Sequence, residues 1–153
     1  MRYEYIEPFV RSTVKVLDSV IQCDITKGTA ALVKGDEITD DIAIVVRLRG
    51  DSEGNIILNM PEDTALKVCN AMFGDVSGTL TSLGMDSIAE LANMIAGNAA
   101  SVLNDMGYDL TVSPPLIIRK DEIKGETLEV ETFRIPLFTE YGEMTMNVAL
   151  RTN

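Results

Sequence analysis

The chain carries the same succession of helix and strands twice, and this repetition restricts its possible folds more than any other feature. In the first half, apolar residues recur every three or four positions from Ile6 to Ile21. This spacing is typical of an amphipathic helix, and Pro8 fits its first turn if the helix begins near Glu7. Three strand-like segments follow, at residues 25–34, 41–49 and 55–60. The first half therefore predicts one long helix and three strands.

A turn and a short helix complete the first half. Residues 50–54 (Gly-Asp-Ser-Glu-Gly) have the composition of a turn, which predicts an antiparallel hairpin of the strands on either side. Pro61 and Gly74 stand where a short helix would begin and end. Its apolar spacing predicts an inward face formed by Leu66, Cys69 and Phe73.

The second half restarts the pattern with a helix from Met85 to Met106, which Gly107 closes. Three strand-like segments follow again, at residues 109–119, 126–137 and 142–151. With a shift of 85 residues the two halves align, so that Leu32-Val33 meets Ile117-Ile118. The second half thus predicts the same plan as the first.

The repeated plan indicates an α+β fold with two pseudo-symmetric halves, each a long helix plus about three antiparallel strands, with the helices packed on the sheet. We expect one domain spanning residues 1–153, with half-repeats at about 1–75 and 80–153. The alternative is a coincidence between two similar amphipathic patterns.

The helix predicted at 85–106 separates into two faces when its residues are placed at 3.6 per turn. The predicted buried stripe comprises Ile88, Leu91, Ile95, Ala99, Val102 and Met106. The opposite face comprises Asp86, Glu90, Asn93, Gly97 and Asn104, with Ala100 at its border. This face has no Lys or Arg, unlike ordinary exposed faces with paired long charged side chains. A mid-helix Gly costs about 1 kcal/mol relative to Ala, and close approach of a partner surface would explain Gly97.

Glu90 and Asn93 place a negative charge and a neutral amide one helical turn apart. A carboxylate can bind a cationic group on a partner, while an amide can hold a water molecule. Phosphoryl hydrolysis through a loose transition state depends mainly on the position of the attacking water, not on a strong base. The pair therefore suits a reaction in which the chain orients water.

The chain contains no histidine, and this absence narrows the possible chemistry. It removes the usual general base near neutral pH, every Ser-His-Asp or Cys-His arrangement, and the commonest zinc and iron ligand. Any reaction must use carboxylates, amides, hydroxyls, lysines or groups of a partner.

The net charge of −11 argues against nucleic acids and anionic membranes as partners, since both bind through clusters of Lys and Arg. Cys23 and Cys69 lie far apart and have neither metal-binding nor redox spacing. No segment has the pattern of a signal peptide or of a membrane span. These observations predict a protein of the reducing cytoplasm.

The segment from Met85 to Ala99 contains the pattern Asp86-x-x-x-Glu90-x-x-Asn93. It resembles the signature helix of the CheC/CheX/FliY chemotaxis phosphatases, and chain length and the single motif are most similar to the CheX type. In architecture the resemblance covers the whole chain. The family has a proline about 22 residues beyond the Asn, whereas Pro114 and Pro115 follow after 20 and 21 intervening residues, a small departure.

The resemblance implies hydrolysis of the aspartyl phosphate on a CheY-like response regulator, which ends its signal to the flagellar motor. Asn93 would align the attacking water, and Glu90 would pair with the active-site lysine of the receiver domain. Asp86 would shape the helix start or support Glu90, and the small Gly97 surface would help to admit the partner. The receiver holds Mg²⁺ in this reaction, so no cofactor or metal site is expected in this chain.

The residues of the first helix indicate how many catalytic sites the chain has. In family members with two sites, each long helix carries its own Glu and Asn. Here Glu7 is present, but Val10 occupies the place of the amide and cannot orient a water molecule. The resemblance therefore implies one site per chain, in the second half.

The family also implies a two-fold homodimer whose sheets join edge to edge. The alternative function is that of a non-catalytic CheC-like adaptor or flagellar-switch binding module with the same fold. An adaptor would need only Glu90 to grip a lysine, so the presence of Asn93 favours the phosphatase.

Overall fold

The computed structural model describes residues 3–34, 40–74, 78–119 and 131–152, and it confirms the α+β class. A short 3₁₀ helix precedes the first long helix, and the two halves then follow one another along the chain. The elements are η1 Tyr3–Tyr5, α1 Glu7–Ile21, β1 Ile25–Lys27, β2 Ala31–Lys34, β3 Ile42–Gly50, β4 Ser52–Met60, α2 Glu62–Phe73, α3 Ser82–Asp105, β5 Leu110–Val112, β6 Leu116–Arg119, β7 Glu131–Thr139 and β8 Gly142–Thr152.

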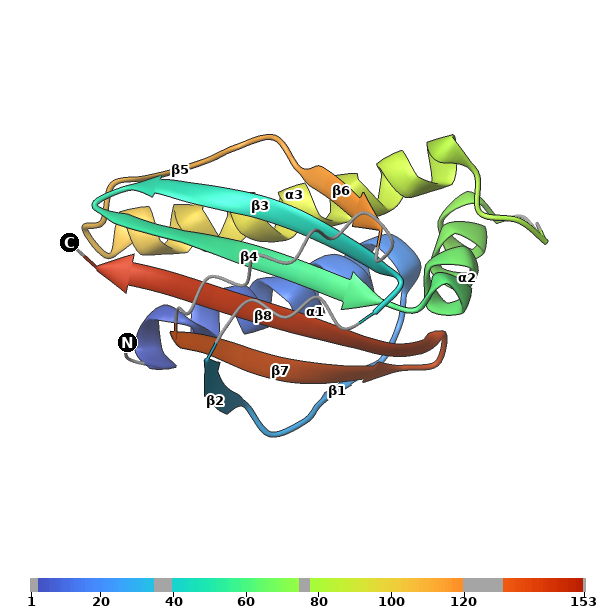
Figure 1. The fold of residues 1–153 in the computed structure, drawn as a ribbon, viewed down its shortest axis with the longest axis horizontal. Coiled ribbons are helices and arrows are strands. Elements are labelled where there is room, and N and C mark those ends of the chain that lie inside the picture. The colour runs from blue at the N-terminus through green and yellow to red at the C-terminus, as the bar shows by residue number, and fades with distance from the viewer. Residues whose placement is uncertain (1–2, 35–39, 75–77, 120–130, 153) are drawn as a thin grey trace.

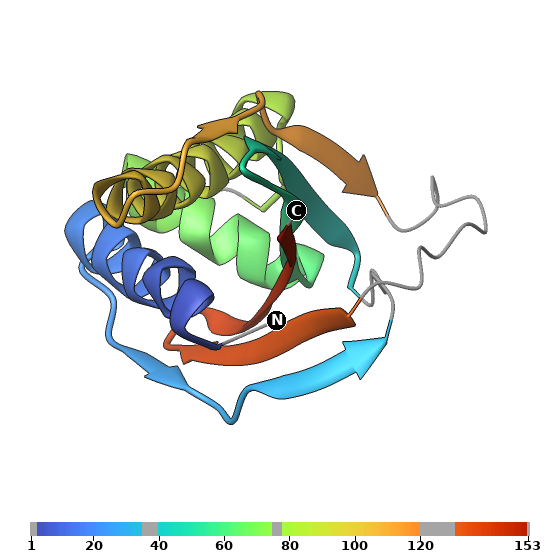
Figure 2. The same cartoon turned by 90° about the vertical axis from the view of Figure 1, so that its left-hand side faces the viewer.

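The fold consists of one antiparallel sheet with the helices on one of its faces. In Figure 1 the sheet lies in front of α1 and α3, and Figure 2 shows the helices gathered on the same side of the curved sheet. Apolar residues alternate along the central strands toward the helices, as Met144, Met146 and Val148 do in β8. The buried core thus lies between the sheet and the helices.

The strand order reads the same when the two halves are exchanged. The sheet runs β1-β7-β8-β4-β3-β5, with β2 also pairing with β7 and β6 also pairing with β3. The short strands of each half therefore extend the long hairpin of the other half. Neither half completes the described sheet without the other.

Within the described residues each half contributes four strands. The segments predicted at 25–34 and 109–119 are both divided into two short strands, at 28–30 and at 113–115. The second break contains Pro114 and Pro115, which have no N–H for a sheet ladder. The beginning of the strand predicted at 126–137 lies outside the described residues, and β7 is described from Glu131.

The prediction of a turn over residues 50–54 is wrong in extent. The hairpin closes at Asp51, and Gly54 lies within β4 opposite Leu48. A Cβ atom at Gly54 would lie 1.9 Å from the carbonyl oxygen of Ala149 on β8. Gly54 is therefore a strand residue that lets the two central strands approach one another.

Three apolar side chains predicted to face inward are exposed: Phe73, Val102 and Met106. Phe73 is the last residue of α2. The buried residues of α2 are Thr64, Ala65, Val68 and Cys69, so the prediction for Cys69 is confirmed. Val102 and Met106 line an open groove of about 470 Å³ between the first turns of α1 and the end of α3. Whether a side chain at the end of a helix is buried depends on how far the neighbouring helix extends beside it. The spacing of apolar residues in the sequence does not show this.

Replacing Gly54 by Ala tests the close approach of β4 and β8. The added methyl group would overlap the β8 backbone, so Gly54→Ala should lower the free energy of unfolding by about 2–4 kcal/mol. The midpoint of urea denaturation measures the change. Gly97→Ala is the matched control, because a Cβ atom at Gly97 meets nothing within 4 Å. Equal midpoints for Gly54→Ala and the wild type would contradict the register.

Candidate functional site

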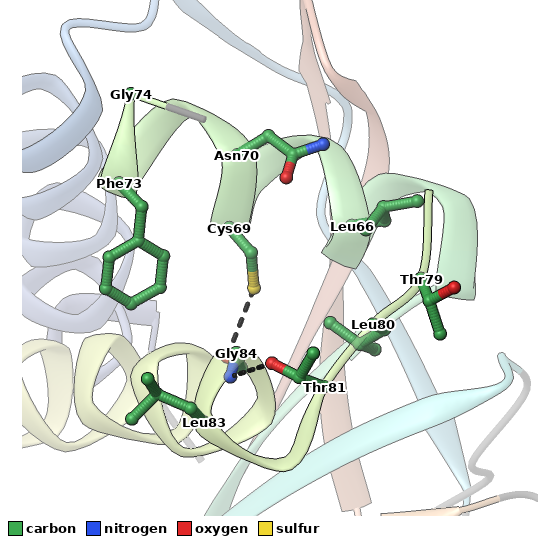
Figure 3. A pocket seen from close by; sticks show the side chains of 10 residues that line it. All are labelled: Leu66, Cys69, Asn70, Phe73, Gly74, Thr79, Leu80, Thr81, Leu83 and Gly84. Carbon is green, nitrogen blue, oxygen red and sulfur yellow. Dashed lines mark hydrogen bonds between the residues drawn. The ribbon is translucent and has the colours of Figure 1, made fainter. Parts of the chain in front are cut away.

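The start of α3 is held by its own cap and by α2. Thr81 is the N-cap, and its hydroxyl oxygen accepts a hydrogen bond from the Gly84 N–H at 3.1 Å. The Cys69 thiol on α2 donates to the Gly84 carbonyl oxygen, with 3.1 Å between sulfur and oxygen (Figure 3). Burial raises the pKa of this thiol, which keeps its proton available for the bond. The helix begins three residues before the predicted Met85.

The middle of α3 is packed against α1 and the sheet over a broad face. Seven buried residues there form two adjacent rows, each with steps of three and four: Ile88, Leu91, Ile95 and Ala99 in one row, and Ala89, Ala92 and Ala96 in the other. Alanines are frequent in this face, and their small side chains let neighbouring elements approach closely. Ala100, which we expected at the border of the exposed face, is buried as well. The packing fixes the rotation of α3 and so determines which side chains face outward.

The predicted site residues lie together on the outward face of α3. Asp86 and Glu90 are exposed, and Asn93 and Gly97 are half-buried. Within the described part of the chain, no hydrogen bond or ion pair engages Asp86, Glu90 or Asn93. Residues three apart on a helix have Cβ atoms about 5–6 Å from one another. The carboxylate of Glu90 and the amide of Asn93 are therefore adjacent and available to a partner.

Asn104 has a structural task. Its side-chain oxygen accepts from the Leu110 N–H at 2.8 Å, and its amide nitrogen donates to the Leu110 carbonyl oxygen at 3.2 Å. These two bonds tie the end of α3 to the start of β5. Asn104 is exposed as predicted, but its amide is occupied.

The first long helix does not carry a second pair. Val10 is 1% exposed and packs in the core, so this position faces inward on α1. Glu7 is exposed, and its carboxylate forms an ion pair with Arg11 one turn further on. The arrangement on α3 thus has no equivalent on α1.

Sequence reasoning missed two exposed apolar side chains beside the pair, Leu83 and Met94. Leu83 precedes the predicted helix start, and the available signal was Thr81, a favoured N-cap residue. Met94 is adjacent to Asn93 in the sequence, and its exposure follows from the same helical projection that placed Glu90 outward. The surface around the pair therefore combines a charge, an amide and apolar contacts.

Among the described residues, no group of three or more His, Cys, Asp or Glu side chains could hold a metal ion. In the same residues, none of the helices has the length and apolar character needed to cross a membrane.

Known proteins resemble this chain in sequence and in fold. The family model for chemotaxis phosphatase CheX matches residues 42–138. The CheY-P phosphatase CheX of Thermotoga maritima is 28% identical over 133 residues, which are 86% of this chain and 83% of that protein.

Solved structures extend the likeness to the whole fold. A CheX–CheY–BeF3–Mg²⁺ complex from Borrelia burgdorferi matches with a TM-score of 0.79 and 27% identity, over 98% of this chain and 99% of that one. A CheC-like superfamily protein from Shewanella matches in fold, with a TM-score of 0.86 at 22% identity over 99% of both chains.

The matched region includes the whole of α3, with Asp86, Glu90, Asn93 and Gly97, and most of the sheet. It extends over more than half of the chain, and the fold agrees over nearly all of it. The chain therefore belongs to the chemotaxis phosphatase CheX family.

Proposed function

We propose that this protein hydrolyses the aspartyl phosphate of a CheY-like response regulator and so ends its signal in a chemotaxis pathway. The observation that carries the proposal is the adjacent pair of Glu90 and Asn93, outward on α3 and without a partner in the described part of the chain. Its relatives support the proposal, since one is named as a CheY-P phosphatase and another was solved in complex with CheY.

In the proposed reaction Asn93 holds a water molecule in line with the phosphorus atom. The water oxygen forms a bond with phosphorus while the bond from phosphorus to the aspartate oxygen breaks, and the receiver regains its carboxylate. The protons of the water leave with the phosphate. Positioning alone lowers the barrier of such a reaction, because its transition state is loose and needs no strong base. A chain without histidine is able to perform it.

Glu90 serves the docking of the partner. Its carboxylate would pair with the active-site lysine of the receiver, and a charge-assisted bond of this kind fixes the orientation of two surfaces. Asp86 lies one turn nearer the start of α3, exposed like Glu90. Asp86 would support Glu90, without contact to the reacting atoms. Mg²⁺ would be held by the receiver, as it is part of the Borrelia complex with CheY.

Replacing Asn93 by Ala tests whether its amide is needed for dephosphorylation or only for binding of the receiver. Asn93→Ala should reduce the single-turnover rate of receiver dephosphorylation by a factor on the order of 100, because the water loses its orienting group. Binding of a beryllofluoride-activated receiver should remain. Glu90→Ala should mainly weaken that binding. If Asn93→Ala dephosphorylates the receiver as fast as the wild type, the water-positioning mechanism is wrong. A wild-type protein that binds the receiver without accelerating its dephosphorylation would instead support the non-catalytic adaptor.

Gly97 belongs to the proposed docking surface. Apart from the helix's own backbone, a Cβ atom there would meet nothing within 4 Å in the described part of the chain, so packing among these residues gives no reason for a glycine in mid-helix. Gly97→Ala should therefore raise the free energy of unfolding by about 0.5–1 kcal/mol. It should also lower the affinity for the activated receiver, since the methyl group occupies space that the partner needs.

The two readouts for Gly97→Ala are thermal denaturation and receiver affinity. A protein that becomes more stable and binds the receiver less tightly fits the proposal. A more stable variant with unchanged affinity would remove Gly97 from the docking surface.

We include a homodimer and a cytoplasmic location in the proposal. The described sheet ends in β1 and β2 on one side and in β5 and β6 on the other. Unpaired edges favour association, and each edge carries an exposed leucine, Leu32 on β2 and Leu116 on β6. A two-fold dimer would pair one of these edges with its own copy.

Light scattering coupled to size exclusion tests the dimer. The wild type at micromolar concentration should have twice the chain mass of 16.7 kDa. Leu32→Lys and Leu116→Lys each place a charge on one edge of the sheet. The variant whose lysine lies on the edge that pairs should be a monomer, and the other variant should remain a dimer. A monomeric wild type would contradict this part of the proposal.

A further inference from the structure

A groove between α2 and α3 lies close to the proposed site and has no part in its chemistry. It occupies about 450 Å³ between the second half of α2, the segment before α3 and the first turn of α3. Figure 3 shows its apolar lining, with Phe73 and Leu83 at one end and Leu66 and Leu80 at the other. Its polar lining residues are threonines, an asparagine and the buried thiol of Cys69. None of the ten residues that line it is charged.

The rim of this groove carries two large apolar side chains that are exposed to solvent. Leu83 is 68% exposed and Phe73 is 54% exposed, in a chain in which 24% of residues are charged. Single exposed apolar side chains are ordinary, whereas neighbouring ones around a concave neutral surface are typical of a binding surface. The groove therefore needs a partner whose contacting surface is apolar.

Leu83 lies on the same face of α3 as Glu90. Seven residues are close to two full turns, so the two side chains share one row along the helix, about 10 Å apart along its axis. Glu90 is exposed in the same direction, with the exposed Met94 one turn further on. The groove is thus continuous with the surface that carries the proposed catalytic pair.

A protein interface centred on Glu90 would be large enough to include this groove. A specific interface covers about 800 Å² on each partner, which is a disc of about 16 Å radius. A receiver whose lysine contacts Glu90 would therefore also cover Leu83 and the rim of the groove. The receiver is the partner that we assign to this groove, because its proposed contact with Glu90 already places it over the neighbouring part of α3.

The charge of both partners favours an apolar contact at this place. This chain has a net charge of −11, and a phosphorylated receiver is anionic at its active site. Long-range electrostatic attraction is therefore a poor source of affinity, and burial of neutral apolar surface does not depend on charge.

On these grounds, and resting on the function proposed above, we infer that the α2–α3 groove is a second contact for the receiver, which inserts an apolar side chain against Leu83 and Phe73. This contact is made equally before and during phosphoryl hydrolysis. It therefore contributes to affinity and leaves the chemical step unchanged.

The test compares Leu83→Ser and Phe73→Ser with Met106→Ser as a matched control. Met106 is an apolar side chain at the far end of α3, 53% exposed and 16 residues from Glu90, or about 24 Å along the helix axis. Steady-state dephosphorylation of a CheY-type receiver gives KM and kcat, and titration with the beryllofluoride-activated receiver gives Kd. Leu83→Ser should raise KM and Kd about tenfold with kcat unchanged, and Phe73→Ser should act in the same direction. Met106→Ser should behave as the wild type.

Two outcomes would overturn the inference. One is an unchanged KM and Kd for both groove variants, with circular dichroism showing that they are folded. The other is a change in oligomeric mass for Leu83→Ser, which would assign the groove to a second copy of this chain. Asn93→Ala measured in parallel keeps the two proposals apart, because its loss of turnover tests the water-positioning mechanism whether or not the groove binds the receiver.

Discussion

The packing of α3 against α1 and the sheet is the interaction on which the rest of the structure depends. A broad face of alanines and branched apolar residues is buried, which fixes the rotation of the helix about its axis. Only then do Glu90 and Asn93 point outward on adjacent turns. The same packing requires both halves of the chain, since the short strands of each half extend the hairpin of the other. The site thus belongs to one helix, but its orientation is a property of the whole sheet.

A rigid helix face suits a reaction that consists of positioning. The proposed catalytic amide lies on a helix whose start is capped by Thr81 and held by Cys69, and whose end is tied to β5 by Asn104. Precise placement of a water molecule gains from such rigidity, because little ordering remains to be done when the partner arrives. The remaining groups of the reaction, which are the phosphorylated aspartate, the lysine and the metal ion, would come from the receiver. The lack of histidine is then no obstacle.

Most of the elements could be predicted from the sequence, because they depend on local periodicity. Periodicity also placed Glu90 and Asn93 on the outward face of the helix, whereas their proposed roles rest on the resemblance to a known family. Ile88, Leu91 and Ile95 are buried and Glu90 is exposed, as the projection of a single helix requires. The wrong predictions are at positions where a neighbouring helix or strand determines whether a residue is buried or lies in a turn. Val102 and Met106 follow the apolar period and are nevertheless exposed, because the first turns of α1 leave a groove beside them. Gly54 has the residue type of a turn but lies in β4, where the approach of β8 requires it. Leu83 was missed because a cap, not periodicity, sets the start of α3.

The most direct test of the central claim is a structure of this protein bound to a beryllofluoride-activated CheY-type receiver. We expect the outward face of α3 to lie over the receiver's active site. The Asn93 amide should be about 3 Å from a water molecule in line with the beryllium atom, and the Glu90 carboxylate should be in contact with the receiver's lysine. A complex in which Glu90 and Asn93 remain outside the interface would contradict it.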